Sequence, residues 1–251
     1  IEAMDPRYAA EPSGDRAARD RAYAEAMGAL SKRHHDDLDA ATLYAEALMD
    51  LRPWQLWSLD GEPAPETPEI IEVLESVLRR QPDHAGAIHF YIHAVEASPQ
   101  PERALAWARR LPVLAPAAGH LVHMPTHIQT LVGEYAESGR INDRAAQVDR
   151  DAIARGQGGT VYPMLYFNHN MHMAAYSYAM AGRYADARRA ADQVVEHATP
   201  AAKEMPMLEM FTPTALLVDV KFRRWDAVLA APVPAAHLPV TRAVRHFARG
   251  M

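Results

Sequence analysis

Residues 162–200 read YPMLYFNHNMHMAAYSYAMAGRYADARRAADQVVEHATP and indicate the fold most directly. Apolar and small residues recur at helical spacing over 162–181 and again over 184–198. Gly182-Arg183-Tyr184 interrupts the pattern as a turn, and Pro200 ends the second run. The stretch therefore predicts two antiparallel helices joined by a short turn.

The same organisation extends in both directions from this pair. Strand signals are weak: alternation is rare, and there is no Asn-Gly or Asp-Gly hairpin sequence. The turn residues Pro99 and Gly133 lie 34 residues apart, and longer loops separate the later turns. We expect an all-α protein, a single helical array over 1–251, built from helix-pair units at approximately 36–82, 84–116, 119–156, 162–200 and 205–232. Each of the segments 119–132, 162–181 and 205–222 is predicted as one helix.

AMAGRYADARRAADQVVEHATP (179–200) resembles the second half of a tetratricopeptide repeat (TPR). It has the small residue before Gly182, the aromatic Tyr184, Ala187 and the closing Pro200, and the 34-residue interval is the length of that repeat. The resemblance implies antiparallel helix pairs stacked as a right-handed superhelix, an α-solenoid. Four further stretches are LYAEALMDLRPW (43–54), HFYIHAVEAS (89–98), GHLVHMPTH (119–127) and YFNHNMHM (166–173). Together they resemble a histidine-rich group of bacterial tetratricopeptide-like proteins. That second resemblance implies no activity.

The histidines of three predicted helices are in register. We count back along the chain from each of the turn residues Pro99, Gly133 and Gly182. The sixth residue before each turn is His93, His127 and Tyr176, respectively. The tenth is His89, His123 or His172, and the thirteenth is Gly86, His120 or His169. On an α-helix these offsets fall within an arc of roughly 60°. In the repeat family the first helix of each pair lines a concave groove, so the resemblance implies that all seven histidines face that groove. They are no part of the general repeat consensus, and most repeats here lack its aromatic residue early in the first helix.

We interpret the aligned histidines as a transition-metal site. Imidazole pairs at i,i+3 and i,i+4 can present two ligands from one helix face, and neutral imidazole suits Zn, Cu, Fe and Ni. The candidate ligands are His89, His93, His120, His123, His127, His169 and His172. Seven are too many for one tetrahedral ion, so the centre could be mononuclear or dinuclear. Glu96 is the candidate base or extra ligand, and Tyr176 is the candidate ligand, proton donor or substrate-stacking residue.

The resulting hypothesis is a metal-dependent enzyme that acts on a small-molecule substrate in the groove. Oxidation or oxygenation with Cu or Fe is slightly favoured over hydrolysis with Zn, because obvious carboxylate ligands are few. The alternative, which the family resemblance alone implies, is a non-catalytic scaffold that binds a peptide or protein partner. A metal-binding groove without catalysis would have the same sequence.

Composition limits the other possibilities. The 251 residues carry a net charge of −6, which argues against a nucleic-acid surface. The absence of cysteine excludes disulfides and thiolate metal sites. No apolar run has the length of a membrane span, and no signal peptide is visible, so we expect a cytoplasmic protein. The chain begins without Met and ends within a predicted helix, so we also expect a fragment of a longer protein.

Overall fold

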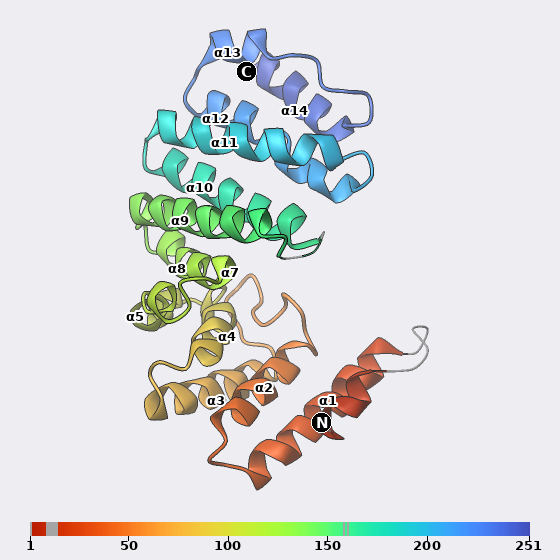
Figure 1. The fold of residues 1–251 in the computed structure, drawn as a ribbon, viewed down its shortest axis with the longest axis vertical. Helices are drawn as coiled ribbons and strands as arrows, with labels where there is room; N and C mark the ends of the chain where they lie inside the picture. The colour runs from red at the N-terminus through yellow and green to blue at the C-terminus, as the bar shows by residue number, and fades with distance from the viewer. Residues whose placement is uncertain (1, 9–14, 158, 160) are drawn as a thin grey trace. The chain divides into compact units, whose positions relative to one another are not determined.

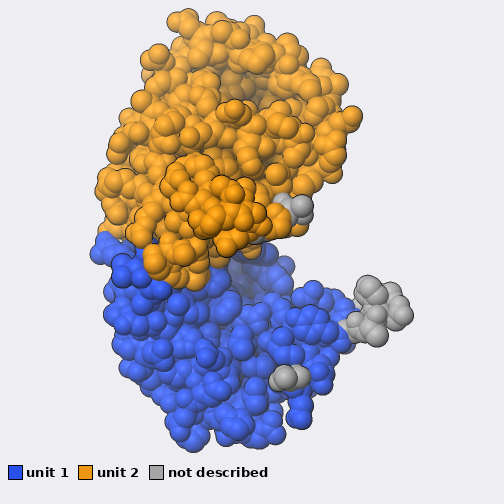
Figure 2. Space-filling view, viewed as in Figure 1, with its two compact units in different colours: residues 1–114 blue, residues 115–251 orange. Residues whose placement is uncertain are grey.

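The structure is a computed structural model that describes residues 2–8, 15–157, 159 and 161–251. In these ranges all regular elements are helices, and one isolated bridge joins Trp57 to Pro63. The prediction of an all-α protein is thus confirmed. The chain divides into two compact units, residues 1–114 and residues 115–251, which Figure 2 shows in blue and orange.

Unit 1 consists of a short N-terminal 3-10 segment followed by helices (Figure 1). Its elements are η1 (Glu2–Arg7), α1 (Arg16–Arg33), α2 (Leu38–Met49), α3 (Thr67–Arg80), α4 (Ala85–Val95), η2 (Pro101–Ala104), α5 (Leu105–Ala108) and α6 (Leu111–Leu114). Side-chain caps set several of the helix starts. Asp15 and Asp37 accept from backbone amides of α1 and α2, and the Nδ1 atom of His84 does the same for α4.

Unit 2 contains the region from which the sequence analysis began. Its elements are α7 (Gly119–His123), α8 (Pro125–Leu131), α9 (Tyr135–Ala154), η3 (Pro163–Phe167), α10 (Asn168–Met180), α11 (Tyr184–Ala198), η4 (Thr199–Ala201), η5 (Pro206–Phe211), α12 (Thr214–Lys221), α13 (Trp225–Ala230) and α14 (Pro239–Gly250). Helices α9, α10, α11 and α12 each pack against the next along the chain (Figure 1). Gly182, with a positive φ of 74°, makes the predicted turn between α10 and α11.

Each unit has its own buried core. In unit 1, α3 and α4 bury aliphatic residues on their facing sides, among them Leu74, Leu78, Ile88 and Ile92. In unit 2, the contact between α10 and α11 is built from small side chains: Ala174, Ala175, Ala187, Ala190 and Ala191, all buried. Small residues let helix axes approach closely, which holds α10 rigidly between its neighbours.

Two of the three segments predicted as continuous helices are broken, and the third, 162–181, is a continuous helical run that contains a π-helical turn. Within 119–132, Pro125 lacks a backbone N–H and begins a new helix, α8, at its first position. Within 162–181, the first turn is the π-helical η3, and the regular α10 begins at Asn168. Within 205–222, Pro213 separates the 3-10 segment η5 from α12. Helix periodicity alone does not register these local changes of winding.

Candidate metal centre

The α7–α8 junction places two histidines on one side of the chain despite the break at Pro125. Met124 keeps right-handed helical angles, with φ −50° and ψ −38°, so His123 and His127 retain the i,i+4 relationship. The two rings lie edge to face with centroids 4.8 Å apart, and their Nε2 atoms are 2.9 Å apart. This pair therefore presents two nitrogens to one point.

A third histidine reaches the same point from α10. The Nε2 atom of His169 lies 3.1 Å from the Nε2 atom of His123. His123, His127 and His169, hereafter the histidine triad, form a group whose ligand atoms all lie within 4.8 Å of one another. Nitrogens about 3 Å apart fit one ion at metal–nitrogen distances of about 2.0–2.1 Å, with N–metal–N angles near ~95°. The triad thus has the spacing of three ligands on one face of a transition-metal ion.

The environment keeps the central imidazole neutral. His123 is completely buried, whereas His127 and His169 are partly buried. Burial lowers the pKa of His123 well below its usual value, and the neighbouring His127 and His169 lower it further. A neutral imidazole is the form that binds a metal ion.

A hydrogen-bond chain fixes which nitrogen of His123 carries its proton. The Nδ1 atom lies 2.6 Å from the Oδ1 atom of Asn142 on α9, and the Nδ2 atom of Asn142 donates to the backbone carbonyl of Ser138 at 3.0 Å. The amide is thereby oriented with its oxygen toward His123, so Nδ1–H donates and Nε2 keeps its lone pair. Ser138 in turn lies 2.8 Å from Ser177 of α10, oxygen to oxygen.

His120 lies beside the triad without joining it. Its ring stacks on His123 with centroids 6.1 Å apart and meets the ring of Tyr166 at 4.9 Å. Tyr166 stacks on Tyr162 at 4.9 Å. Four aromatic rings therefore form a continuous row from the buried His123 to the exposed Tyr166 and its neighbour Tyr162.

The buried carboxylate of Asp149 holds Tyr162, the last ring of this row, by a hydrogen bond. The hydroxyl of Tyr162 donates to Asp149 at 2.8 Å and accepts from the backbone N–H of His120 at 3.2 Å. The second oxygen of Asp149 accepts from Asn170 at 2.7 Å. Burial raises the pKa of Asp149, although both hydrogen bonds oppose that rise, and burial together with Asp149 raises the pKa of Tyr162.

The other predicted residues of unit 2 lie apart from the triad. His172 is one turn further along α10, where its ring packs edge-on against Phe211 at 5.6 Å, and burial lowers its pKa. Tyr176 lies a further turn along and is 46% exposed. His169, His172 and Tyr176 share one side of α10 in the predicted register. The structure nevertheless places His169 at the triad, His172 against Phe211 and Tyr176 at the surface.

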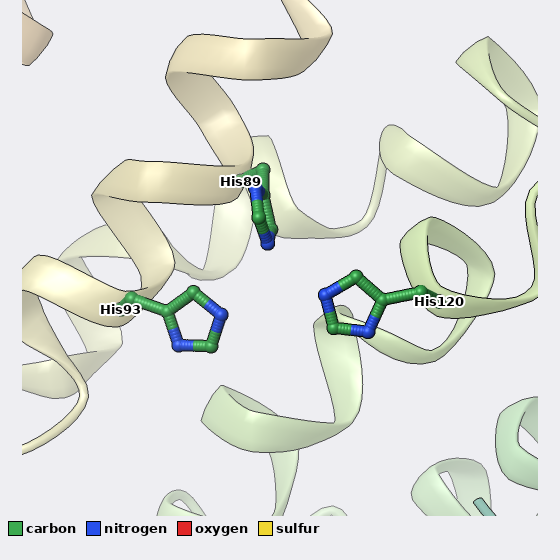
Figure 3. Close-up of side chains that lie close together, drawn as sticks. All are labelled: His89, His93 and His120. Atoms are coloured by element: carbon green, nitrogen blue, oxygen red, sulfur yellow. The ribbon is translucent and has the colours of Figure 1, made fainter. Parts of the chain in front are cut away.

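His89 and His93 belong to unit 1. Both imidazoles project from the same side of α4, one turn apart, and their centroids are 5.0 Å apart (Figure 3). The Nδ1 atom of His93 lies 2.9 Å from the predicted base Glu96. The third residue labelled in Figure 3, His120, belongs to unit 2 and is described above with that unit.

Four residues of the hydrogen-bond networks around His123 and His120 were not predicted from the sequence. They are Asn142, Ser138, Asp149 and Tyr162. Asn142 lies among other polar residues of a helix, so it does not stand out in the sequence. The feature that could have indicated it is the low helix propensity of asparagine inside a long helical segment. Asn168 and Asn170, by contrast, are conspicuous beside His169, but Asn168 contacts His197 and the carbonyl of Met164. Helical phase does not reveal which buried amide meets which imidazole.

Among the described helices, none has the length and apolar character needed to cross a membrane. Comparison of the sequence with family models and with curated proteins finds no match. The geometry of the site therefore carries the functional argument.

Proposed function

We propose that this chain is a metal-dependent enzyme whose centre is one transition-metal ion bound by the Nε2 atoms of His123, His127 and His169. The observation that carries the proposal is the convergence of His127 and His169 on the bare Nε2 atom of His123, at 2.9 and 3.1 Å. The Asn142 contact supports it, because ligating histidines commonly donate their second nitrogen to a fixed acceptor. Three protein ligands leave coordination positions for a substrate or water.

The reaction favoured is oxidation of a small molecule by copper or iron. Three imidazole ligands without a carboxylate suit copper, and the row His123, His120, Tyr166 and Tyr162 places two tyrosines next to the triad. Tyrosine is the side chain in this row that can take part in one-electron chemistry, which favours a redox metal. Zinc on the same ligands would instead activate water for hydrolysis.

The test is the metal content of untagged protein after aerobic and anaerobic purification. We expect about one Cu or Fe ion per chain, lost in His169→Ala and His127→Ala. These two ligands are only partly buried, so their replacement endangers the fold less than replacement of His123. His172→Ala is the matched control, because His172 shares α10 with His169 but lies against Phe211.

Three outcomes contradict the proposal. One is a native protein that takes up no metal even after anaerobic reconstitution. The second is metal that folded His169→Ala retains. The third is metal lost equally from His172→Ala, which would locate the ligands elsewhere. A stoichiometric zinc content would keep the site but replace oxidation with hydrolysis.

For the finer fold we propose the tetratricopeptide-like superhelix that the sequence resembles. The sequential packing of α9, α10, α11 and α12 and the glycine turn at Gly182 support it. Small-angle X-ray scattering of the full chain tests it, because an open superhelix gives a more elongated distance distribution than a closed helical bundle.

A further inference from the structure

Unit 1 contains a pocket that the metal centre does not use. It has a volume of about 360 Å³ and lies between α2, the following loop and the end of α4. Three aromatic side chains line it, Trp54, Trp57 and Phe90, together with three carboxylates, Glu46, Asp50 and Glu96. The size is sufficient for a small organic molecule.

Trp54 is held at the pocket in an unusual way. Its backbone has φ +64°, in the left-handed region that bulky residues rarely adopt, and its side chain is 89% exposed. The ring stands edge-on to His93 at 6.4 Å, and no apolar burial offsets the strain. A strained, exposed indole is a feature associated with ligand-binding sites. Trp57, by contrast, is anchored by a 2.8 Å hydrogen bond to the carbonyl of Ala94.

The charges at the pocket favour a cation. Glu46 of α2 and Asp50, the residue that follows α2, are four residues apart, and both carboxylates line the pocket. Arg52, the basic residue of the lining that is always charged, is paired with Glu66 at 2.6 Å. Aromatic faces and carboxylates together recognise organic cations, whereas Mg²⁺ and Ca²⁺ prefer sites of oxygen ligands alone.

The chain itself shows how a guanidinium binds at these carboxylates. Arg7, from η1, pairs with Glu46 at 3.3 Å and with Asp50, and its guanidinium lies 4.7 Å from the ring centre of Tyr23. Tyr23 also donates to Glu46 at 3.3 Å. Arg7 is not part of the pocket wall, but it shares both carboxylates with the pocket.

We propose that this pocket binds a small organic cation, an ammonium or guanidinium group on an aromatic or alkyl body. The cationic group lies at Glu46 and Asp50 and the body lies against Trp54, Trp57 and Phe90. Arg7 competes for the carboxylates and weakens binding. The proposal rests on residues of unit 1 and uses none of the triad.

Isothermal titration of the full chain with two probes of equal size tests the charge requirement. Phenethylamine is a cation at neutral pH, and 2-phenylethanol is its neutral isostere. We expect the cation to bind at least about tenfold more tightly, because a charged hydrogen bond to a carboxylate partner contributes more than ~1.4 kcal/mol. Equal affinity for both probes, or no binding of phenethylamine to either the native protein or Arg7→Met, overturns the proposal.

Variants test the named residues. Trp54→Gly should weaken phenethylamine binding by about 3- to 30-fold. Loss of the fold is not expected, because glycine accepts a positive φ, and Arg223→Gly at φ +54° is the matched backbone control. Glu46→Gln should weaken binding, Arg7→Met should strengthen it, and Asp60→Asn, an exposed change outside the pocket, should have no effect. Unchanged affinity in both Trp54→Gly and Glu46→Gln refutes the assignment.

Discussion

The Nδ1 atom of His123 and the Oδ1 atom of Asn142 lie 2.6 Å apart inside unit 2, and both residues are completely buried. The contact joins α7 to α9 and determines which nitrogen of the imidazole is free to bind a metal ion. A residue of α9 that lies outside the triad thereby orients its central imidazole.

Replacement of Asn142 by Ala should lower metal affinity by about 10- to 100-fold, the usual effect of removing the partner of a ligating histidine. Asn142→Asp retains an oxygen acceptor and should preserve most of the affinity. Competition with a chromophoric chelator measures the change. Asn168→Ala is the control, because it removes another buried amide that contacts His197 rather than the triad. Equal loss in both alanine variants would show a general effect of destabilisation.

Gly119→Ala should destabilise the protein by about 1–3 kcal/mol, the range for overpacking a filled site. A Cβ atom at Gly119 would lie 1.8 Å from the Oδ1 atom of Asp149, which is buried and held by Tyr162 and Asn170. Urea unfolding measures the effect. Gly86→Ala, also in the first turn of a helix, meets nothing nearer than 3.5 Å and should be neutral or stabilising. A neutral Gly119→Ala would mean that Asp149 can move freely.

Trp54→Gly should raise the free energy of unfolding by roughly 1 kcal/mol, the cost of a left-handed conformation for a residue with a Cβ atom. Because the side chain is 89% exposed, little apolar burial is lost with it. Trp54→Ala retains the Cβ atom and should give almost none of this gain. If both variants are less stable than the native protein in thermal unfolding, the indole makes a packing contribution that its exposure does not indicate.

The stability of the metal-free protein should fall as the pH drops below about 6.5, the ordinary pKa of histidine. Burial lowers the pKa values of His172 and His197, so protons bind first to the unfolded chain and draw the equilibrium toward it. Above this pH their contribution is fully present. The raised carboxyl pKa values of Glu46 and Asp149 act in the opposite sense, at lower pH.

Urea unfolding at pH 7.5 and 5.5 measures the fall, and His197→Gln isolates one contribution. Glutamine can still hydrogen-bond to Asn168 but does not take up a proton, so the variant should lose less stability between the two pH values. An unchanged difference would show that His197 does not contribute to the pH dependence.

The fold class and the triad follow from two periodicities in the sequence. Helical spacing identified α11 to the residue, because the break before it coincides with Gly182. The i,i+4 spacing identified His123 and His127 as a pair, and the shared register with α10 pointed to His169 and His172 alike. Local geometry is sufficient for two histidines of one helical stretch such as His123 and His127.

The other contacts of the site could not be predicted from the helical periodicity of the sequence. His172 has the same register position as His123, yet it packs on Phe211, because η5 lies beside that turn of α10. Asn142 reaches His123 across a helix boundary, and the asparagines next to His169 make other contacts. Which polar residue of a helix contacts a given histidine depends on the element that packs opposite it. That arrangement is a property of tertiary packing.

The π-helical turn η3 has a consequence for insertions and deletions. A π turn contains one residue more than an α turn, so removing one residue from Pro163–Phe167 should convert it to regular helix and leave α10 continuous. The segment before it would then rotate by about 100° about the helix axis. Such a deletion would carry Tyr162 away from Asp149 while His169 stayed opposite His123. The extra residue thus sets the angle about the helix axis between Tyr162 and His169.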